Sequence, residues 1–129
     1  MESRTLDLIG YWKSDQHPEY PDPTDWIDPE YSERDRELFA LSLDSGMLAR
    51  QFLGLSTCRI CGAANGSAEL SDGRFLWPSG LSHYVREHSV RLPPKIEAAI
   101  VASFDAIEGA DIDEELWRRE TSGGRSHVV

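Results

Sequence analysis

Cysteine is scarce in this chain, with only two among 129 residues, and this excludes a fold held by several disulfides. No apolar run approaches the roughly 20 residues that a membrane-spanning helix needs, so we expect no contact with a membrane. The first residues lack the basic region followed by an apolar one that marks a secretory signal, so we expect a cytoplasmic protein. Thiols stay reduced in that compartment, which favours a metal site over a disulfide.

Basic residues are also few, because 13 lysines and arginines stand against 23 aspartates and glutamates, for a net charge of −10. The imbalance is uneven along the chain. Residues 1–57 carry −7 and residues 96–129 carry −5, whereas residues 58–95 carry +2. Nonspecific affinity for DNA or RNA comes largely from cations that contact phosphate, so this composition argues against a nucleic acid as the main partner.

The two cysteines form a C-x2-C knuckle, Cys58 to Cys61, and after 21 intervening residues His83 and His88 follow as H-x4-H. Two thiolates and two imidazoles make a complete tetrahedral set for Zn²⁺. His83 and His88 can share an ion if their helix tightens or ends at His88. We therefore expect one structural zinc ion bound by Cys58, Cys61, His83 and His88, with no open position for a substrate.

Other interpretations use the same residues. A thioredoxin-like redox pair would need C-x-x-C between a strand and a helix, whereas residues 62–66 (Gly-Ala-Ala-Asn-Gly) are typical of a loop. A metalloprotease would carry H-E-x-x-H or H-x-x-E-H, and residues 83–88 are one residue too long for the second pattern. We predict no catalytic residue, although a zinc site with one ligand missing would leave a metalloenzyme possible.

The first half of the chain contains one strong helix signal. Residues 11–31 are rich in proline and aspartate, which excludes a regular helix there, and we expect an extended arm packed on the body. Ser32 is a good N-cap for a helix over residues 32–45 that ends at Gly46. Its leucines Leu38 and Leu41 are expected to face the core.

The middle of the chain is expected to build the zinc module, residues 58–92. An extended stretch over residues 51–56 leads into the knuckle, and Asp72-Gly73 predicts a β-hairpin of residues 67–70 and 74–77. Residues 78–80 (Pro-Ser-Gly) then end the strand and open a short helix over residues 81–88. Trp77 is expected to be a core anchor between the hairpin and this helix.

The C-terminal part is predicted to be helical over residues 94–119. Pro94 suits the first turn of a helix, and Ile96, Ile100, Phe104 and Ile107 recur at helical spacing. A last short helix over residues 112–119 is expected to dock through Leu116 and Trp117. Residues 121–129 are expected to form a disordered tail.

Together these elements predict an α+β fold in one small domain, residues 1–120. The zinc module would be an enlarged ββα-like unit of knuckle, β-hairpin and short helix, packed against the N- and C-terminal helices. Its order resembles that of a classical zinc finger with a longer hairpin.

The same segment resembles a group of small bacterial zinc-finger-like proteins. The resemblance lies in the C-x-x-C-G knuckle at 58–62, the W-P-x-G-L-x-H-Y-V segment at 77–85 and the histidine at 88. It implies a bacterial cytosolic protein with a zinc module, and it brings no known activity.

Three classes of function remain open. We favour a small zinc-stabilised interaction or regulatory protein, because a closed metal site stabilises a small core and leaves its surface free for a partner. The alternatives are a nucleic-acid-associated zinc-finger protein and a metalloenzyme with an open zinc site. The zinc module carries four arginines that could bind a partner: Arg59, Arg74, Arg86 and Arg91. If they form one patch, we expect a locally acidic protein partner or the molecule's own acidic arm. The sequence does not predict the oligomeric state.

Overall fold

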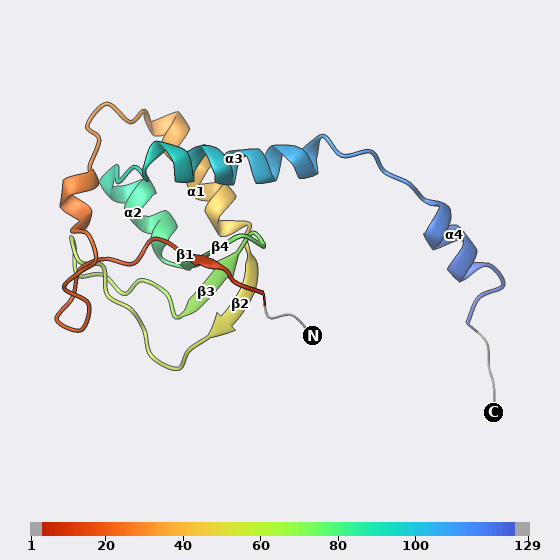
Figure 1. Ribbon diagram of the computed structural model, residues 1–129, viewed down its shortest axis with the longest axis horizontal. Coiled ribbons are helices and arrows are strands. Elements are labelled where there is room, and N and C mark those ends of the chain that lie inside the picture. The colour runs from red at the N-terminus through yellow and green to blue at the C-terminus, as the bar shows by residue number, and fades with distance from the viewer. Residues whose placement is uncertain (1–3, 126–129) are drawn as a thin grey trace.

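The computed structural model describes residues 4–125 (Figure 1). Within this range one mixed sheet contains the strands β1 (Asp7–Leu8), β2 (Met47–Gln51), β3 (Ala68–Ser71) and β4 (Phe75–Pro78). The helices are α1 (Glu33–Asp44), α2 (Leu81–His88), α3 (Pro94–Glu108) and α4 (Glu115–Thr121), with a short 3-10 helix, η1, at Pro23–Trp26. The expected α+β fold with a knuckle, a hairpin and a short helix is confirmed. None of the helices within residues 4–125 has both the length and the apolar character that crossing a membrane requires.

The sheet has the strand order β1-β4-β3-β2. The β3–β4 hairpin forms as predicted, and the carboxylate of Asp72 accepts the backbone N–H groups of Arg74 and Phe75 at 3.0 and 2.9 Å. The sequence did not predict β1, which pairs with β4 in the parallel direction. The extended stretch expected at residues 51–56 is wrong in its placement, because β2 lies at Met47–Gln51. Beyond the last strand pair, Gln51 with Ala68, the Phe52 N–H still donates to the Ser67 carbonyl at 2.7 Å, but residues 52–56 are not part of a regular strand.

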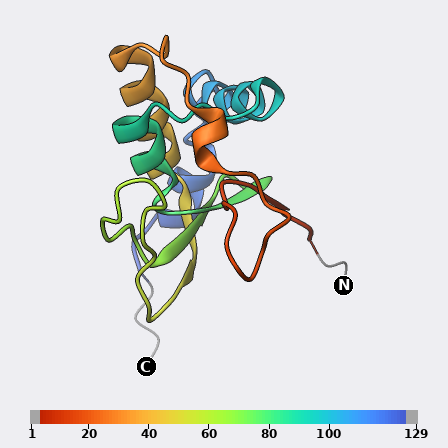
Figure 2. The same ribbon diagram turned by 90° about the vertical axis from the view of Figure 1, so that its left-hand side faces the viewer.

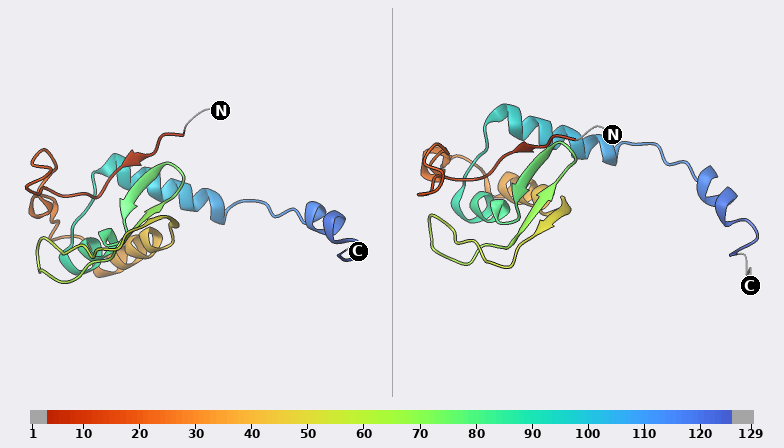
Figure 3. Two further views of the ribbon diagram at one scale, coloured as in Figure 1. Left: turned by 90° about the horizontal axis from the view of Figure 1, so that it is seen from below. Right: turned by 60° about the horizontal axis from the view of Figure 1, so that its bottom comes forward.

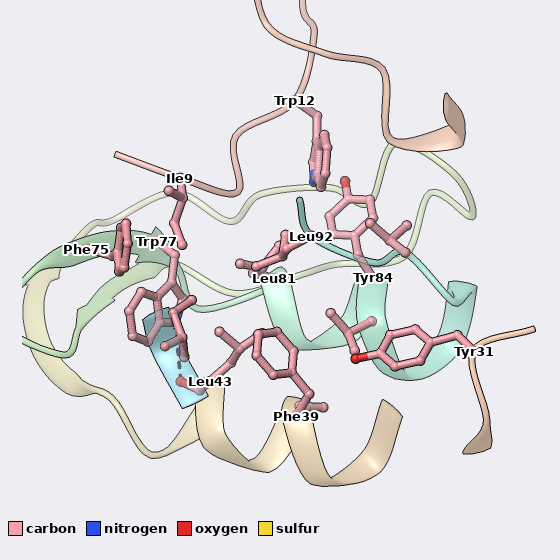
Figure 4. Close-up of a cluster of buried hydrophobic side chains, with 14 of the residues drawn as sticks. Ile9, Trp12, Tyr31, Phe39, Leu43, Phe75, Trp77, Leu81, Tyr84 and Leu92 are labelled. Carbon is pink, nitrogen blue, oxygen red and sulfur yellow. Dashed lines mark hydrogen bonds between the residues drawn. The ribbon is translucent and has the colours of Figure 1, made fainter. Parts of the chain in front are cut away.

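The helices α1, α2 and α3 cover one side of the sheet (Figure 2). Trp77 on β4 is fully buried beneath them, as expected, and its indole Nε1 donates a hydrogen bond to the Leu43 carbonyl at 3.2 Å (Figure 4). Leu81 of α2 and Ile100 of α3 complete this cluster. The turn after α1 passes so close that a Cβ at Gly46 would lie 2.7 Å from Cζ2 of Trp77. The absence of a side chain at Gly46 therefore lets α1 and the sheet pack together.

The helix α1 begins as predicted, because the Ser32 side chain accepts the backbone N–H of Asp35 at 3.1 Å. The expectation that Leu38 and Leu41 face the core is wrong, since both are about half exposed. The buried face of the helix consists of Phe39, Ala40 and Leu43. The sequence of α1 contains two apolar stripes, and packing against α2 and Trp77 selects the second one.

The Pro-rich segment, residues 11–31, follows the surface of the body and contains η1. Two backbone hydrogen bonds join it to the chain after α2: Asp28 N–H donates to the Ser89 carbonyl, and Arg91 N–H donates to the Trp26 carbonyl, both at 2.9 Å. Tyr31, at the end of the segment, is buried in the core (Figure 4). These contacts hold the segment against the exit of α2.

The C-terminal part extends beyond the sheet (Figures 1 and 3). Ile100 of α3 is buried, whereas Ile107 near its end is exposed. The expected docking of the last helix through Leu116 and Trp117 is wrong, because no residue of α4 is buried. The chain between the two helices, residues 109–114, runs outward instead of turning back. Of the tail expected at residues 121–129, residues 126–129 lie outside the described part.

Candidate metal centre

The knuckle is a small backbone hairpin. Thr57 and Ala64 form an antiparallel bridge, and the Cys58 N–H donates to the Ala63 carbonyl at 2.8 Å. Inside the hairpin the Gly62 N–H donates to the Cys58 carbonyl at 2.9 Å, and Gly62 has a φ of +76°. A left-handed conformation of this kind favours glycine, so the residue after Cys61 closes the turn.

The helix α2 presents the two histidines and ends directly after the second one. Ser89 adopts the left-handed region with a φ of 55°, and the Val90 N–H donates to the Tyr84 carbonyl at 3.1 Å. The imidazole rings of His83 and His88 lie 5.1 Å apart, centroid to centroid, at an interplanar angle of 77°. The helix thus ends at the residue where the H-x4-H spacing requires it to end if both rings are to share an ion.

The knuckle and α2 bring four possible ligands together: Cys58, Cys61, His83 and His88. Each offers one ligand atom, and these atoms all lie within 4.8 Å of one another. Sγ of Cys61 and Nε2 of His83 are 3.4 Å apart. Zinc–sulfur and zinc–nitrogen bonds of ordinary length predict about 3.6 Å for such a pair on a tetrahedral ion. The donor set and its spacing therefore fit a tetrahedral metal ion.

The buried side of the cluster contains an unsatisfied nitrogen. Nε2 of His88 is buried and has no hydrogen-bond partner among residues 4–125. Burial lowers the pKa of His88, the charge of His83 lowers it further, and Glu87 opposes the shift. A buried nitrogen without a partner is costly, whereas a neutral imidazole is the form that binds a metal. His88 thus has the properties of a ligand.

Cys58 is the inner thiol and is almost completely buried, whereas Cys61 is exposed. Burial on its own raises the pKa of Cys58, but hydrogen bonds from the N–H groups of Cys61 and Ile60 and from the side chains of Cys61 and Tyr84 lower it overall. The Ile60 nitrogen lies 3.4 Å from the Cys58 sulfur. The surroundings therefore favour the thiolate, which is the form that binds zinc.

Tyr84 connects the knuckle to α2, and sequence reasoning missed its role. Its hydroxyl accepts the Arg59 N–H at 2.8 Å, and burial, as the largest cause, raises the pKa of Tyr84 to about 12. The indole of Trp12 packs on the phenol ring with centroids 5.6 Å apart (Figure 4). Tyr84 precedes His88 by four residues, so helical spacing alone places it on the ligand face.

Asn65 makes a second connection that the sequence did not reveal. Its buried side-chain amide donates to the Gly80 carbonyl at 3.1 Å, directly before α2. Its backbone N–H donates to the Ser56 carbonyl at 2.8 Å, across the knuckle hairpin. The sequence of residues 62–66 indicated only a loop. Protein contacts thus hold the knuckle against α2 in addition to any metal.

Arg86 and Arg91, two of the four arginines singled out as partner-binding candidates, contact carboxylates of the chain itself. Arg86 lies 2.7 Å from Glu37 and 3.2 Å from Asp44, both on α1. Arg91 lies 3.2 Å from Asp28 of the Pro-rich segment. Much of the charge of these two arginines is therefore balanced within the molecule.

The other two arginines, Arg59 and Arg74, are far apart in the fold. Arg59 belongs to the knuckle, which precedes β3, whereas Arg74 lies in the turn that follows β3 and packs over the Phe75 ring at 4.9 Å. The two residues thus lie beyond opposite ends of the same strand. At least Arg59 and Arg74 are therefore not neighbours, and partner binding by these arginines stays a prediction.

Two cysteines from a knuckle and two histidines from a helix form a compact donor set with one buried, unsatisfied nitrogen. Compared with protein-family models, curated proteins and solved structures, the chain has no match.

Proposed function

We propose that the chain binds one Zn²⁺ through Cys58, Cys61, His83 and His88, and that the ion has a structural role. The observation that carries this proposal is the convergence of four ligand atoms within 4.8 Å. A tetrahedral zinc ion needs its ligand atoms about 3.3–3.8 Å apart, so only small side-chain movements are required. Four protein ligands fill the coordination sphere and leave no position for a substrate.

The choice of zinc rests on the donor chemistry. Thiolates are soft ligands and imidazoles intermediate ones, and a tetrahedral set of two of each is typical of structural zinc. The ion would join the knuckle to α2 across the hairpin that separates them. Structural zinc contributes on the order of 10 kcal/mol to the folding of zinc-finger peptides, which is comparable to the total stability of a small domain.

The wider function we propose is that of a small interaction or regulatory protein in the bacterial cytosol, in keeping with the resemblance of residues 58–93. Support comes from exposed apolar residues on β2 and in the loop between β2 and the knuckle. An apolar set on β2 and the loop after it is exposed: Met47, Leu48, Phe52, Leu53 and Leu55. Several large exposed apolar side chains in one stretch of chain are consistent with a surface that binds a protein partner.

Metal analysis tests the zinc proposal. Protein purified without added metal should contain about one equivalent of zinc, and Cys58→Ser and His88→Gln should each lose it. His17→Gln is the matched control, because His17 is an exposed histidine outside the cluster of possible ligands and should not affect metal content. A wild-type protein that contains no metal and stays folded in chelator would overturn the proposal.

Replacing the zinc by Co²⁺ distinguishes the structural site from an open one. A closed site with two sulfurs and two nitrogens should give the intense visible bands of tetrahedral Co²⁺ and a thiolate charge-transfer band. Weak bands typical of five or six ligands would instead favour the metalloenzyme. The spectrum should also stay unchanged when azide is added, because no position is open to it.

A further inference from the structure

A small apolar cleft lies between the segment after β1 and the start of α3. Its volume is about 200 Å³. Its walls include Ile9, Trp26 and Ile96, together with Tyr20 and Leu92. Trp26 at its rim is partly exposed, so the cleft is open to solvent. A volume of this size accepts one large apolar side chain.

The wall of the cleft that the Pro-rich segment forms is acidic, whereas Arg91 and Lys95 adjoin the lining residues of the opposite wall. The Pro-rich segment, residues 11–31, supplies Tyr20 and Trp26 and carries six acidic residues against a single lysine. Asp22 and Asp25 are exposed and lie in and beside η1, next to these lining residues. Charge complementarity therefore favours an occupant in which a large apolar side chain is followed by basic ones.

The chain itself contains such a segment in α4. Trp117 is 73% exposed and is followed by Arg118 and Arg119. No residue of this seven-residue helix is buried. A helix so short is not stable alone in water, so α4 needs a surface to pack on. The arginines contact Glu114, Glu115 and Glu120 in exposed ion pairs, which are weak and can be exchanged.

The connection between α3 and α4 is short, and its length favours docking of Trp117 in the cleft of a second molecule over docking in the cleft of its own chain. The cleft lies at the start of α3, whereas α4 is attached at its end, and a helix of 15 residues is about 22 Å long. Residues 109–114 span about 20 Å when fully extended. Docking within one chain would need this connection to be pulled straight back along α3. The connection instead leads away from the body (Figures 1 and 3).

We propose that two copies of the chain associate by exchanging their C-terminal segments, residues 109–121. Trp117 of each copy occupies the cleft of the other, and Arg118 and Arg119 lie near its Asp22 and Asp25. The exchange is reciprocal, so the contact closes on itself as a twofold dimer and does not continue into a filament. It does not involve the metal ligands and does not depend on zinc binding by them.

Light scattering and analytical ultracentrifugation of the full chain over a range of concentrations test the exchange. The wild type should be a dimer, and Trp117→Ala should raise the dimer dissociation constant at least tenfold. The double variant Arg118→Glu with Arg119→Glu should also weaken the dimer and reverse the effect of salt on it. Leu53→Ala is the matched control, because Leu53 is a fully exposed apolar residue outside the proposed contact. Zinc content and melting are measured for every variant, so loss of the fold is recognised separately.

Hydrogen exchange of the α4 amides distinguishes docking of α4 in the cleft of a second copy from docking in the cleft of its own chain. Protection that increases with protein concentration and disappears in Trp117→Ala supports exchange between copies. Protection in a protein that stays monomeric would mean docking within one chain and would overturn the proposal. A protein that is monomeric without protected α4 amides, or a dimer that Trp117→Ala leaves intact, would overturn it as well.

Discussion

Tyr84 lies four residues before His88 on α2, so one face of this helix presents both a candidate metal ligand and the hydroxyl that holds the knuckle. The hydroxyl contacts the backbone of Arg59 and helps to lower the pKa of Cys58, the buried thiol. His88 and the Tyr84 hydroxyl that holds the knuckle therefore come from the same helix, α2. This arrangement places the knuckle before the metal arrives, which reduces the ordering that metal binding must accomplish.

Replacing Tyr84 by phenylalanine should weaken zinc binding while the fold is retained. The ring still packs on Trp12, but the Arg59 N–H loses its acceptor and Cys58 loses a hydrogen bond that favours its thiolate. Loss of a supporting contact of this kind typically lowers metal affinity about 10- to 100-fold. Competition with a chelator of known affinity measures the change. Tyr31→Phe removes a buried hydroxyl that contacts Glu97, away from the centre, and its zinc affinity should stay at the wild-type value.

Replacing Asn65 by alanine should destabilise the protein by about 0.5–1.5 kcal/mol, since the Gly80 carbonyl loses its side-chain donor and keeps only the His83 N–H. Urea unfolding of the zinc-loaded protein measures the free energy of unfolding. Gln51→Ala is the matched control, because it removes an exposed amide that contacts Ser67, and the change should be much smaller. Equal effects of the two variants would contradict the role given to Asn65.

The stability of the metal-free protein should decrease as the pH falls below the ordinary pKa of histidine. Burial lowers the pKa of folded His88, so the unfolded chain takes up its proton at a higher pH than the folded chain does. The stability that His88 contributes is therefore present above the unfolded value, about 6.5, and is lost as the pH falls through the folded one. Urea midpoints of chelator-treated protein between pH 8 and pH 5 should show this loss. His88→Gln should flatten the profile, and His17→Gln should leave it unchanged.

Replacing Gly46 by alanine should cost about 1–3 kcal/mol, because overpacking must displace the Trp77 ring or the turn after α1. The control is Gly54→Ala in the loop after β2, where a Cβ would meet nothing within 4 Å. That substitution should be neutral or slightly stabilising, since it restricts only the unfolded chain. Thermal melting of both variants checks the difference, and a Gly46→Ala variant as stable as the wild type would show that the turn can move.

Reversing the charge of Arg86 should lower the melting temperature, because a glutamate there would lie beside Glu37 and Asp44 on α1. Added salt should reduce the loss, since these groups are partly exposed and screened. Arg74→Glu reverses a charge in the hairpin turn and should change melting much less. A salt-independent loss in Arg86→Glu would point to lost packing of the arginine side chain instead of lost charge.

Local signals predicted the parts of the fold that depend on neighbouring residues. Ser32 caps α1, Asp72 forms the hairpin turn, and the break at residues 78–80 opens α2 at Leu81. In each case a side chain or a restricted backbone acts on residues close in sequence. The metal cluster belongs with them, because residue type and spacing indicated that Cys58, Cys61, His83 and His88 would meet.

The parts that were missed depend on contacts between distant segments. The strand β1 is two residues long and exists because β4 offers it an edge. Leu38 and Leu41 are as apolar as the residues that α1 buries, and only the positions of α2 and the sheet decide between the two faces. Asn65 supports the metal centre only once the knuckle lies against α2. The composition of these segments carried no information about such partners.

The parallel pairing of β1 with β4 affects the order in which the protein can fold during its synthesis on the ribosome. Residues 7 and 8 leave the ribosome long before Phe75 and Leu76, the residues that they pair with. The metal ligands, in contrast, all lie between residues 58 and 88 and can meet as soon as that stretch has emerged. The N-terminal segment must then wait, unpaired, for an edge that has not yet been made. Residues 7 and 8 are thus synthesised well before the strand that holds them in place.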